Sequence, residues 1–320
     1  MQRDVEFSSG GEVCRGTLIT PASGDAPFPT LVMAGGWCYV KEIVMPHYAR
    51  FFVDAGVAVL IFDYRHLGAS GGEPRQHIDP WRQIEDYRNA ISFVEGLPEV
   101  DAERIGIWGI SYSGGHVLIA AALDSRVKFA VSNIPVVDGW VNMRRSHGEL
   151  RFKALREAIL EDRRRRFAHP DDRAYIPMSA PDPATTLSTW PYPEVGEVFA
   201  KIKEAEAPLH QHRSTLESTE LLLAYTVFPY VSRIVNLPVL MLVADGDDIT
   251  LWDQEIEAFN LITSNQKRLF IIKQASHMAL YSSRTRLEIA AGVTAGWLKE
   301  TLALEPVPEP ATAGRAMRSS

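Results

Sequence analysis

Short apolar runs alternate with longer amphipathic stretches along most of the chain. The apolar runs are rich in β-branched residues and are bounded by turn residues, as is typical of buried strands, whereas the longer stretches have the period of surface helices. This alternation predicts an α/β architecture in which helices flank a mostly parallel, eight-stranded sheet. The expected strands span residues 2–7, 12–19, 30–34, 57–63, 104–109, 127–133, 238–244 and 268–273. The expected helices span residues 45–56, 81–96, 112–124, 252–263 and 283–303.

One long segment breaks the alternation. Between Asp138 and Asn236 the strand-like runs disappear, and charged stretches mix with proline-rich turns. We therefore interpret residues 139–235 as a helical lid inserted into an α/β core. That core would comprise residues 1–138 and 236–304.

Two further tracts differ from the rest of the chain. The tract from Glu161 to Arg166 contains a run of arginines. We expect it to be a solvated helix face, paired in part with Glu157 and Glu161 through i,i+4 spacing, rather than a patch for anions. Residues 305–320 are rich in Pro, Ala and Ser and are predicted to form a disordered tail, because they have little apolar surface to bury.

Composition and charge narrow the class of protein. The chain has 320 residues, of which 46% are hydrophobic and 23% charged, as in folded proteins with a sizeable core. A net charge of -7 provides no basic field that would attract nucleic acid or an anionic membrane surface. No apolar run approaches the ~20 residues of a membrane span, and the N-terminus lacks the basic and apolar regions of a secretion signal. We expect a cytoplasmic protein that acts on a small molecule, and the sequence leaves a homodimer open.

The two cysteines predict neither a disulfide framework nor a metal site. Cys14 and Cys38 are the only two, and neither has the spacing of a zinc site or of a disulfide framework. Cys38 is interpreted as a small apolar filler rather than a nucleophile, because no histidine spacing supports it. No metal ion or organic cofactor is implied.

The clearest chemical signal lies in the turn between the expected strand at 104–109 and the expected helix at 112–124. Ser111 occupies this turn, where a strained strand-to-helix corner exposes a serine Oγ at the carboxyl edge of the sheet. The motif departs from G-x-S-x-G, because Ser113 replaces the second glycine. Ser111 is still the better candidate nucleophile than Ser113, since Gly109 stands two residues before it and can close the turn on the strand side.

A serine hydroxyl needs a base, and the base needs an acid that orients it. In the expected architecture the acid precedes the histidine along the chain. Asp247 is favoured over Asp248 and Asp245, which share its turn after the strand at 238–244; capping of the next helix is the competing interpretation. His277 is predicted as the base, because it alone among the histidines lies between the last strand and the last helix.

Acyl transfer also requires hydrogen-bond donors for the oxyanion of the tetrahedral intermediate. The backbone N–H of Tyr112 is one candidate, and the N–H of Trp37, in the glycine-rich loop after residues 30–34, is the other. Gly35 and Gly36 would allow this loop to approach the substrate closely. Aromatic residues of the predicted lid would either form the substrate pocket or pack the lid itself; the pocket candidates are Trp140, Trp190, Tyr225 and Phe228, with Tyr192 and Tyr230 beside them.

These motifs resemble the dienelactone-hydrolase-like and Xaa-Pro-dipeptidyl-peptidase-like branch of the α/β hydrolases. Segments 29–37, 40–42 and 62–75 carry the resemblance together with the turn around Ser111, and the similarity extends over residues 5–138 and 236–303. It implies the α/β-hydrolase fold and a Ser-Asp-His triad. The sequence Ser111-Tyr112-Ser113-Gly114 is similar to the elbow of cocaine-esterase-like enzymes, whose oxyanion hole is completed by a tyrosine hydroxyl, so Tyr39 is an alternative donor.

The resemblance and the residues together favour one activity over three others. We expect hydrolysis of a carboxylic ester, thioester or lactone through an acyl-enzyme on Ser111. Transfer of the acyl group to an acceptor other than water is the main alternative, because fungal polyketide acyltransferases and thiohydrolases look similar around the elbow. A peptidase or amidase is a further variant, and a non-catalytic, receptor-like protein is the least favoured interpretation.

Overall fold

A computed structural model of the chain describes residues 1–304 and contains one eight-stranded sheet, in the order β1-β2-β4-β3-β5-β6-β9-β10. β2 pairs antiparallel with β1 and β4, and the remaining neighbours are parallel. This confirms the predicted mostly parallel sheet, and each predicted strand matches an observed one to within four residues. The strands of the sheet are β1 (Gln2–Ser9), β2 (Glu12–Ile19), β3 (Phe28–Ala34), β4 (Ala58–Phe62), β5 (Val100–Ile110), β6 (Phe129–Asn133), β9 (Val239–Ala244) and β10 (Lys267–Ile272).

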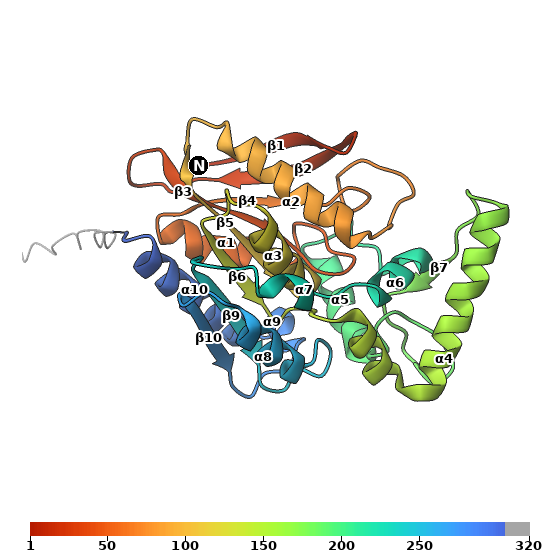
Figure 1. Cartoon of the computed structure of the whole chain (residues 1–320). Helices are drawn as coiled ribbons and strands as arrows, with labels where there is room; N and C mark the ends of the chain where they lie inside the picture. Colours follow the sequence, from red (N-terminus) through yellow and green to blue (C-terminus); the bar gives the residue numbers. More distant parts are fainter. Residues whose placement is uncertain (305–320) are drawn as a thin grey trace, which may run out of the picture.

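Helices cover the sheet and form two packed pairs. α1 packs against α10, and α2 packs against α3 (Figure 1). The central strands β3, β6 and β9 are almost entirely buried, as expected of strands with helices on both faces. The five predicted helices are all present, and the helices of the core are α1 (Met45–Asp54), α2 (Pro80–Glu95), α3 (Tyr112–Leu123), α8 (Trp252–Leu261), α9 (Ala279–Ser282) and α10 (Arg284–Thr301).

The segment between β6 and β9 is mostly helical, and in Figure 1 its longest helix, α4, projects away from the sheet. The expectation that this segment lacks strands was wrong, because β7 and β8 form a small antiparallel sheet. Each of these strands has three residues, which is too short to show an alternating pattern in the sequence. The elements of this segment are α4 (Gly139–Ala168), β7 (Tyr175–Pro177), α5 (Pro193–Ala205), β8 (Arg213–Thr215), α6 (Leu216–Leu223) and α7 (Phe228–Val231).

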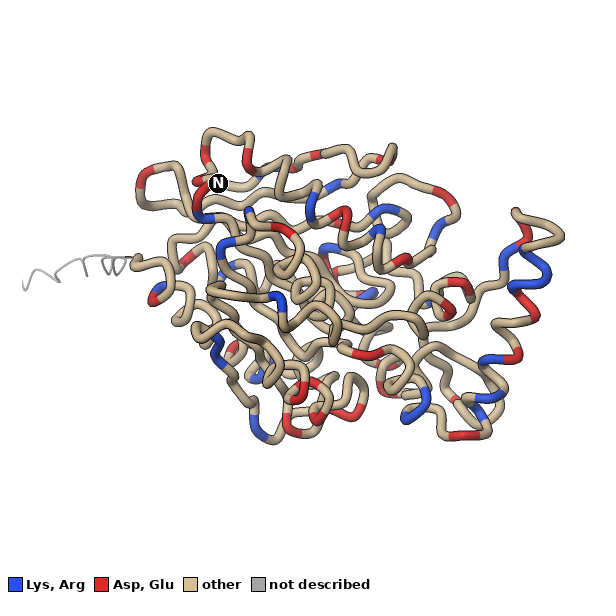
Figure 2. Tube along the Cα trace, viewed as in Figure 1, with Lys and Arg blue, Asp and Glu red and all other residues tan. Residues whose placement is uncertain are grey.

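The arginine-rich end of α4 does not pair as the sequence predicted. Within residues 1–304, Glu157 pairs with a lysine on its own helix and Glu161 forms no ion pair. Figure 2 shows basic and acidic positions interspersed along α4. Because α6 packs against α4, the arginines pair with acidic side chains of α6 instead. These ion pairs include Arg163–Glu220, Arg166–Glu217 and Arg166–Glu220, in addition to pairs with Asp162 on α4 itself.

Two other predictions concern membrane spans and the C-terminal residues. In the described part of the chain, no helix is long and apolar enough to cross a lipid bilayer. The predicted tail, residues 305–320, lies outside the described residues.

Candidate active site

Ser111 lies between the last residue of β5 and the first residue of α3, in a backbone conformation that few side chains adopt. Its φ is 59° and its ψ is -120°. Its N–H donates to the Asn133 carbonyl at 2.9 Å, and its own carbonyl accepts from the Val136 N–H at 3.0 Å, so the neighbouring end of β6 fixes this strained turn. Backbone strain of this kind costs of order 1–3 kcal/mol and concentrates at functional sites. The local geometry is that of a nucleophile elbow.

Glycines allow the close approach of strand and helix at this turn. A Cβ on Gly109 would lie 2.2 Å from the carbonyl oxygen of Ser113, which is far inside van der Waals contact. A Cβ on Gly115 would lie 2.2 Å from the Val136 carbonyl oxygen. A glycine is therefore needed at position 115, two residues after the second glycine position of the G-x-S-x-G motif, because α3 passes close there to the chain that follows β6.

The contacts of Ser113, the alternative nucleophile, are those of a residue with a structural role. Its side chain is fully buried, and its hydroxyl is hydrogen-bonded to the Tyr64 hydroxyl and to the Gly35 carbonyl. These contacts tie the first turn of α3 to the loops that follow β3 and β4. Ser111, by contrast, lines a cavity together with His277. The structure thus places Ser111, and not Ser113, at the cavity.

Asp247 and His277 come from turns that follow the neighbouring parallel strands β9 and β10. Nδ1 of His277 lies 2.7 Å from Oδ2 of Asp247, and both side chains are buried. Asp247 Oδ1 accepts from the backbone N–H groups of Ile249 and Thr250 at 3.0 and 2.8 Å. The carboxylate is therefore held in one orientation, and it fixes the histidine tautomer that carries hydrogen on Nδ1.

The other two carboxylates of this turn point elsewhere. Asp248 is exposed, and its contact is a backbone one, in which its carbonyl accepts from the Tyr192 hydroxyl at 2.7 Å. Asp245 is also exposed and accepts a 3.3 Å hydrogen bond from the Ala275 N–H. Neither carboxylate contacts His277, whereas that of Asp247 does.

The loop after β3 passes directly over Ser111. An ideal Cβ on Gly36 would lie 3.0 Å from Ser111 Cβ and 3.3 Å from its Oγ. The next residue is Trp37, and within residues 1–304 neither its N–H nor that of Tyr112 has a backbone acceptor. The Tyr39 hydroxyl is also buried and has no partner among the described residues. Both arrangements proposed for an oxyanion hole thus have donors available.

Cys38, in the same loop, is not placed as a nucleophile. Its side chain is buried and its thiol donates to the Arg213 carbonyl at 3.2 Å. Burial raises the pKa of this thiol, so the thiolate that would be nucleophilic is disfavoured.

The cavity next to Ser111 and His277 is small and apolar. Its volume is about 20 Å³, enough for a single water molecule but not for an acyl substrate. Its walls come both from the loops of the sheet and from the segment between β6 and β9. Besides the two candidate catalytic residues they comprise Trp37, Tyr39, Met178, Trp190, Val195, Phe199, Ile249, Met278 and Tyr281.

Of the four predicted pocket residues, the structure brings one to this cavity and places the other three away from it. Trp190 lines the cavity, but Trp140 is 42% exposed and packs on Phe152, with ring centroids 5.0 Å apart. Tyr225 lies behind the elbow, 4.9 Å from the Tyr112 ring, and Phe228 packs against the main hydrophobic core. The predicted set relied on aromatic composition, which does not show which helix face meets the sheet edge.

The wall residues that the sequence analysis missed include two close to the predicted base. Met278 and Tyr281 follow His277 within four positions, and the Tyr281 ring stacks on the His277 ring with centroids 5.5 Å apart. Their closeness to His277 along the chain is a signal by which the sequence could have identified them as wall residues. Phe199 lies on the buried face of α5 and has no such signal, because nothing in the sequence shows that this face covers Ser111.

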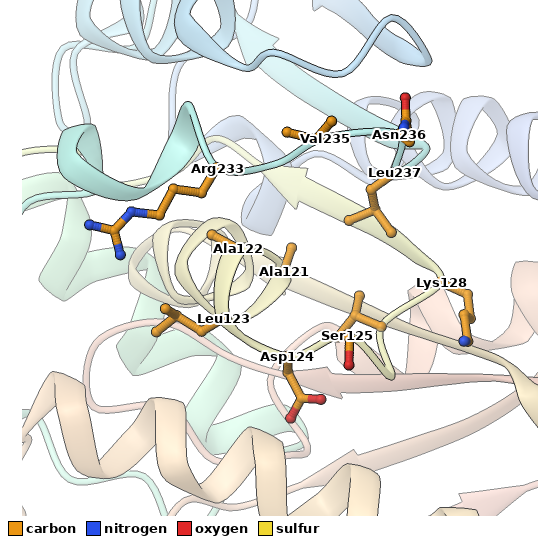
Figure 3. Close-up of a pocket in the computed structure, with 11 residues that line it drawn as sticks. Ala121, Ala122, Leu123, Asp124, Ser125, Lys128, Arg233, Val235, Asn236 and Leu237 are labelled. Carbon is orange, nitrogen blue, oxygen red and sulfur yellow. The ribbon is translucent and has the colours of Figure 1, made fainter.

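A larger surface hollow lies at the opposite edge of the sheet (Figure 3). It has a volume of about 460 Å³ and is formed by the end of α3, the turn before β6 and the segment before β9. The carboxylate in it, Asp124, is already bound to Arg126 at 2.7 Å and to Arg88 at 3.1 Å. Because this hollow adjoins the amino ends of β6 and β9, whereas Ser111 follows the carboxyl end of β5, it does not serve the site described above.

The sheet topology and its covering helices define an α/β hydrolase. The chain belongs to the X-Pro dipeptidyl-peptidase (S15) family, which matches residues 13–279. This is the branch that the sequence motifs resemble.

Solved structures agree with this fold. The α/β hydrolase GrgF from Penicillium sp. sh18 superposes with a TM-score of 0.80 at 24% sequence identity, over 95% of this chain and 100% of that one. DcsB, in a complex with its substrate analogue, superposes with a TM-score of 0.81 at 24% identity and the same coverage. At this level of identity the likeness concerns the fold alone.

Curated relatives include both hydrolases and transferases. Thiohydrolase aneE of Aspergillus aculeatus is 45% identical over 136 residues, which are 42% of this chain and 42% of that protein. The quorum-quenching protein AidA of Acinetobacter baumannii is 39% identical over 137 residues, 43% of this chain and 45% of its own. The chain thus matches less than half the length of these two relatives. Polyketide transferase af380 of Aspergillus fumigatus is 28% identical over 90% of this chain and 94% of its own.

Proposed function

We propose that this protein is a serine hydrolase that cleaves a carboxylic ester, thioester or lactone through an acyl-enzyme on Ser111. One observation carries the proposal: His277, whose Nδ1 lies 2.7 Å from Oδ2 of the buried Asp247, lines the same cavity as Ser111, a serine held at positive φ. Strain at Ser111 has a cost in stability, and a turn without chemistry gives no reason to retain it.

The residues divide the reaction as follows. His277, held by Asp247 through Nδ1, uses Nε2 to take the proton of Ser111 Oγ as that oxygen attacks the acyl carbon. The N–H groups of Trp37 and Tyr112 then donate to the oxyanion, and each such donor contributes about 2.7–4 kcal/mol in hydrolases where it has been removed. His277 returns its proton to the leaving alcohol or thiol. Water, deprotonated by the same histidine, releases the acid.

The walls of the cavity favour an apolar acyl group. Trp190, Phe199 and Met178 line the cavity beside Ser111 from the segment between β6 and β9, and Tyr281 lines it from the core. A thioester of an apolar acid is a suitable substrate, since two relatives carry the name thiohydrolase. Because the cavity holds about 20 Å³, we further propose that residues 139–235 act as a lid that must move before substrate binds.

Acyl transfer is a second candidate, and the apolar walls of the cavity favour it. Such walls offer a water molecule few hydrogen-bond partners, which would slow hydrolysis of the acyl-enzyme and leave time for an alcohol or amine to attack once the lid has moved. A polyketide transferase is also among the relatives that align over most of this chain. Product analysis with a competing alcohol or amine separates the two: free acid as the only product would exclude transfer to that acceptor.

The proposal is tested with acyl p-nitrophenyl esters, an acyl thioester and a fluorophosphonate probe. Ser111→Ala should lower kcat by about 10⁴- to 10⁶-fold and abolish labelling, because the nucleophile is absent. Ser125→Ala, an exposed serine in the turn before β6, is the matched control and should behave like the wild type. Full activity of Ser111→Ala, or labelling at another residue, would show that the proposal is wrong.

A further inference from the structure

A second carboxyl group lies behind the Asp247–His277 pair. Glu255, on α8, is fully buried, and its Oε1 is 2.8 Å from the hydroxyl of Thr250. The same hydroxyl lies 2.8 Å from Asp247 Oδ2 and 3.1 Å from His277 Nδ1. The other oxygen of Glu255, Oε2, has no hydrogen-bond partner among the described residues. One threonine hydroxyl therefore connects Glu255 to the proposed catalytic pair.

The number of protons in this cluster decides how the connection works. The Thr250 hydroxyl has a single hydrogen and cannot donate to two carboxylates at once. With both carboxyl groups ionised, one of them would face a lone pair of the threonine oxygen. Asp247 receives two backbone N–H bonds and the imidazole, whereas Glu255 receives none of these. Asp247 thus has the donors that a carboxylate requires, and Glu255 has the contacts of a protonated carboxyl group.

The charges around Glu255 agree with this assignment. Burial, and after it the negative charge of Asp247, holds the pKa of Glu255 well above its usual range. Asp253, on the same helix, adds a further negative charge, and its carboxylate is bound by Arg145 of α4 at 2.7 Å. Within residues 1–304, no basic side chain pairs with Glu255 itself, and His277 faces it only across Thr250.

We propose that Glu255 is a positioning residue whose neutral carboxyl donates to Thr250, so that the Thr250 hydroxyl in turn donates to Asp247 Oδ2. This inference rests on the proposed function, because it assigns a role to residues behind the proposed triad. Asp247 Oδ2 then accepts from Thr250 as well as from His277, and this additional hydrogen bond further restricts rotation of the carboxylate away from His277. The site also keeps a single negative charge, which pairs with the single positive charge that His277 acquires during the reaction.

Glu255→Gln and Glu255→Met separate donation from packing. Methionine fills similar volume but has no donor, so Glu255→Met should lower kcat about 10- to 100-fold with little change in KM. The glutamine amide can donate to Thr250, so Glu255→Gln should recover most of that loss. Glu257→Gln, two positions along the same helix and exposed, is the matched control and should leave kcat unchanged.

The pH profile and a double mutant provide readouts that packing alone does not change. Because Glu255 is neutral in the resting enzyme, Glu255→Gln should leave the acid limb of kcat/KM at the wild-type pH. Thr250→Val should lower kcat as Glu255→Met does. The double variant should be no worse than Thr250→Val alone, since both changes break the same connection.

Several outcomes would overturn the inference. Wild-type kcat in folded Glu255→Met would do so, and so would an equal loss in Glu255→Gln and Glu255→Met with unchanged melting temperatures. A shift of the acid limb in Glu255→Gln to lower pH, by about one unit, would show that Glu255 is ionised, because removal of a nearby negative charge lowers the pKa of a histidine. If Glu255→Met does not fold, two other measurements test the inference. One is the pH profile of Glu255→Gln, and the other compares kcat of Thr250→Val, which lacks the hydroxyl, with kcat of Thr250→Ser, which keeps it.

Fluorophosphonate labelling of the wild type separates this inference from the proposed function. No labelling at Ser111 would mean that the proposed function is wrong. Normal labelling and turnover, unaffected by Glu255→Met and Thr250→Val, would mean that only the role of Glu255 is wrong.

Discussion

His210 Nδ1 lies 3.0 Å from the carbonyl oxygen of Cys38, the residue after the proposed oxyanion donor Trp37. The thiol of Cys38 contacts the same segment, because it donates to the Arg213 carbonyl at 3.2 Å. Cys38 itself has a φ of 58°, so its backbone needs such support. The segment between β6 and β9 thus holds the loop that passes over Ser111 at two points, and displacement of that segment would also release the loop.

His210→Ala should therefore lower kcat about 10-fold, because the Trp37 N–H loses its fixed position in the transition state. KM should change less, since the walls of the cavity stay in place. Steady-state kinetics with one apolar acyl ester measure both constants. His169→Ala, an exposed histidine of the same segment, is the control. Unchanged kcat in folded His210→Ala would show that the loop holds its position without this bond.

Asp247→Asn and Asp248→Asn test the choice of the acid. An asparagine at 247 cannot hold the histidine tautomer with hydrogen on Nδ1 in the same way, so kcat should fall by about 10⁴-fold with the fold intact. Asp248 is exposed and contacts no catalytic candidate, so its variant should keep kcat within about twofold of the wild type. Rates at saturating substrate distinguish the two. A greater loss in Asp248→Asn would assign the acid to that position.

Gly36→Ala tests how closely the loop must approach Ser111. The added methyl would lie 3.0 Å from Ser111 Cβ and 3.2 Å from the Ile110 carbonyl oxygen, so the loop must move by a few tenths of an ångström. We expect kcat to fall about 10-fold with little change in the melting temperature. Gly292→Ala, in the exposed face of α10 with nothing within 4 Å, should keep full kcat and gain up to about 1 kcal/mol of stability. Equal kinetics for both variants would argue against a tight oxyanion loop.

His116 should make stability depend on pH. It is fully buried between the Tyr225 hydroxyl at 3.1 Å and Gln83 Oε1 at 3.0 Å, and burial lowers its pKa to about 3. The unfolded chain therefore binds a proton here between about pH 6.5 and pH 3 that the folded chain does not, and the free energy of unfolding falls as pH falls through this window.

Urea denaturation at pH 6.5, 5.5 and 4.5 measures this effect. His116→Gln should lose about 1.4 kcal/mol per pH unit of the wild-type slope, because one proton fewer is taken up on unfolding. His169→Ala is the control, and loss of this exposed ring should leave the slope unchanged. An identical slope in His116→Gln and the wild type would show that His116 is protonated in the folded protein.

The sequence alone predicted the sheet, its helices and the order of the chemical groups. These features depend on local pattern: buried strands such as β9 are continuous apolar runs, and polar residues directly after them, such as Asp247, lie at the carboxyl edge wherever the sheet is parallel. His277 was predicted in the same way, from its place after the last strand. Residue order along the chain is sufficient for such inferences, because the direction of a parallel strand determines at which edge of the sheet the residues after it lie.

The pocket walls, the partners of the arginines on α4 and the role of Glu255 required the tertiary structure. Phe199 covers Ser111, and Glu217 meets Arg166, only because separate helices pack with particular faces toward each other. Glu255 stands three residues after a tryptophan on an unremarkable amphipathic helix, and only its burial beside Thr250 connects it with Asp247. Local pattern determines where each strand and helix runs, whereas long-range packing decides which side chains meet, and the environment of each group, including its pKa, follows from that packing.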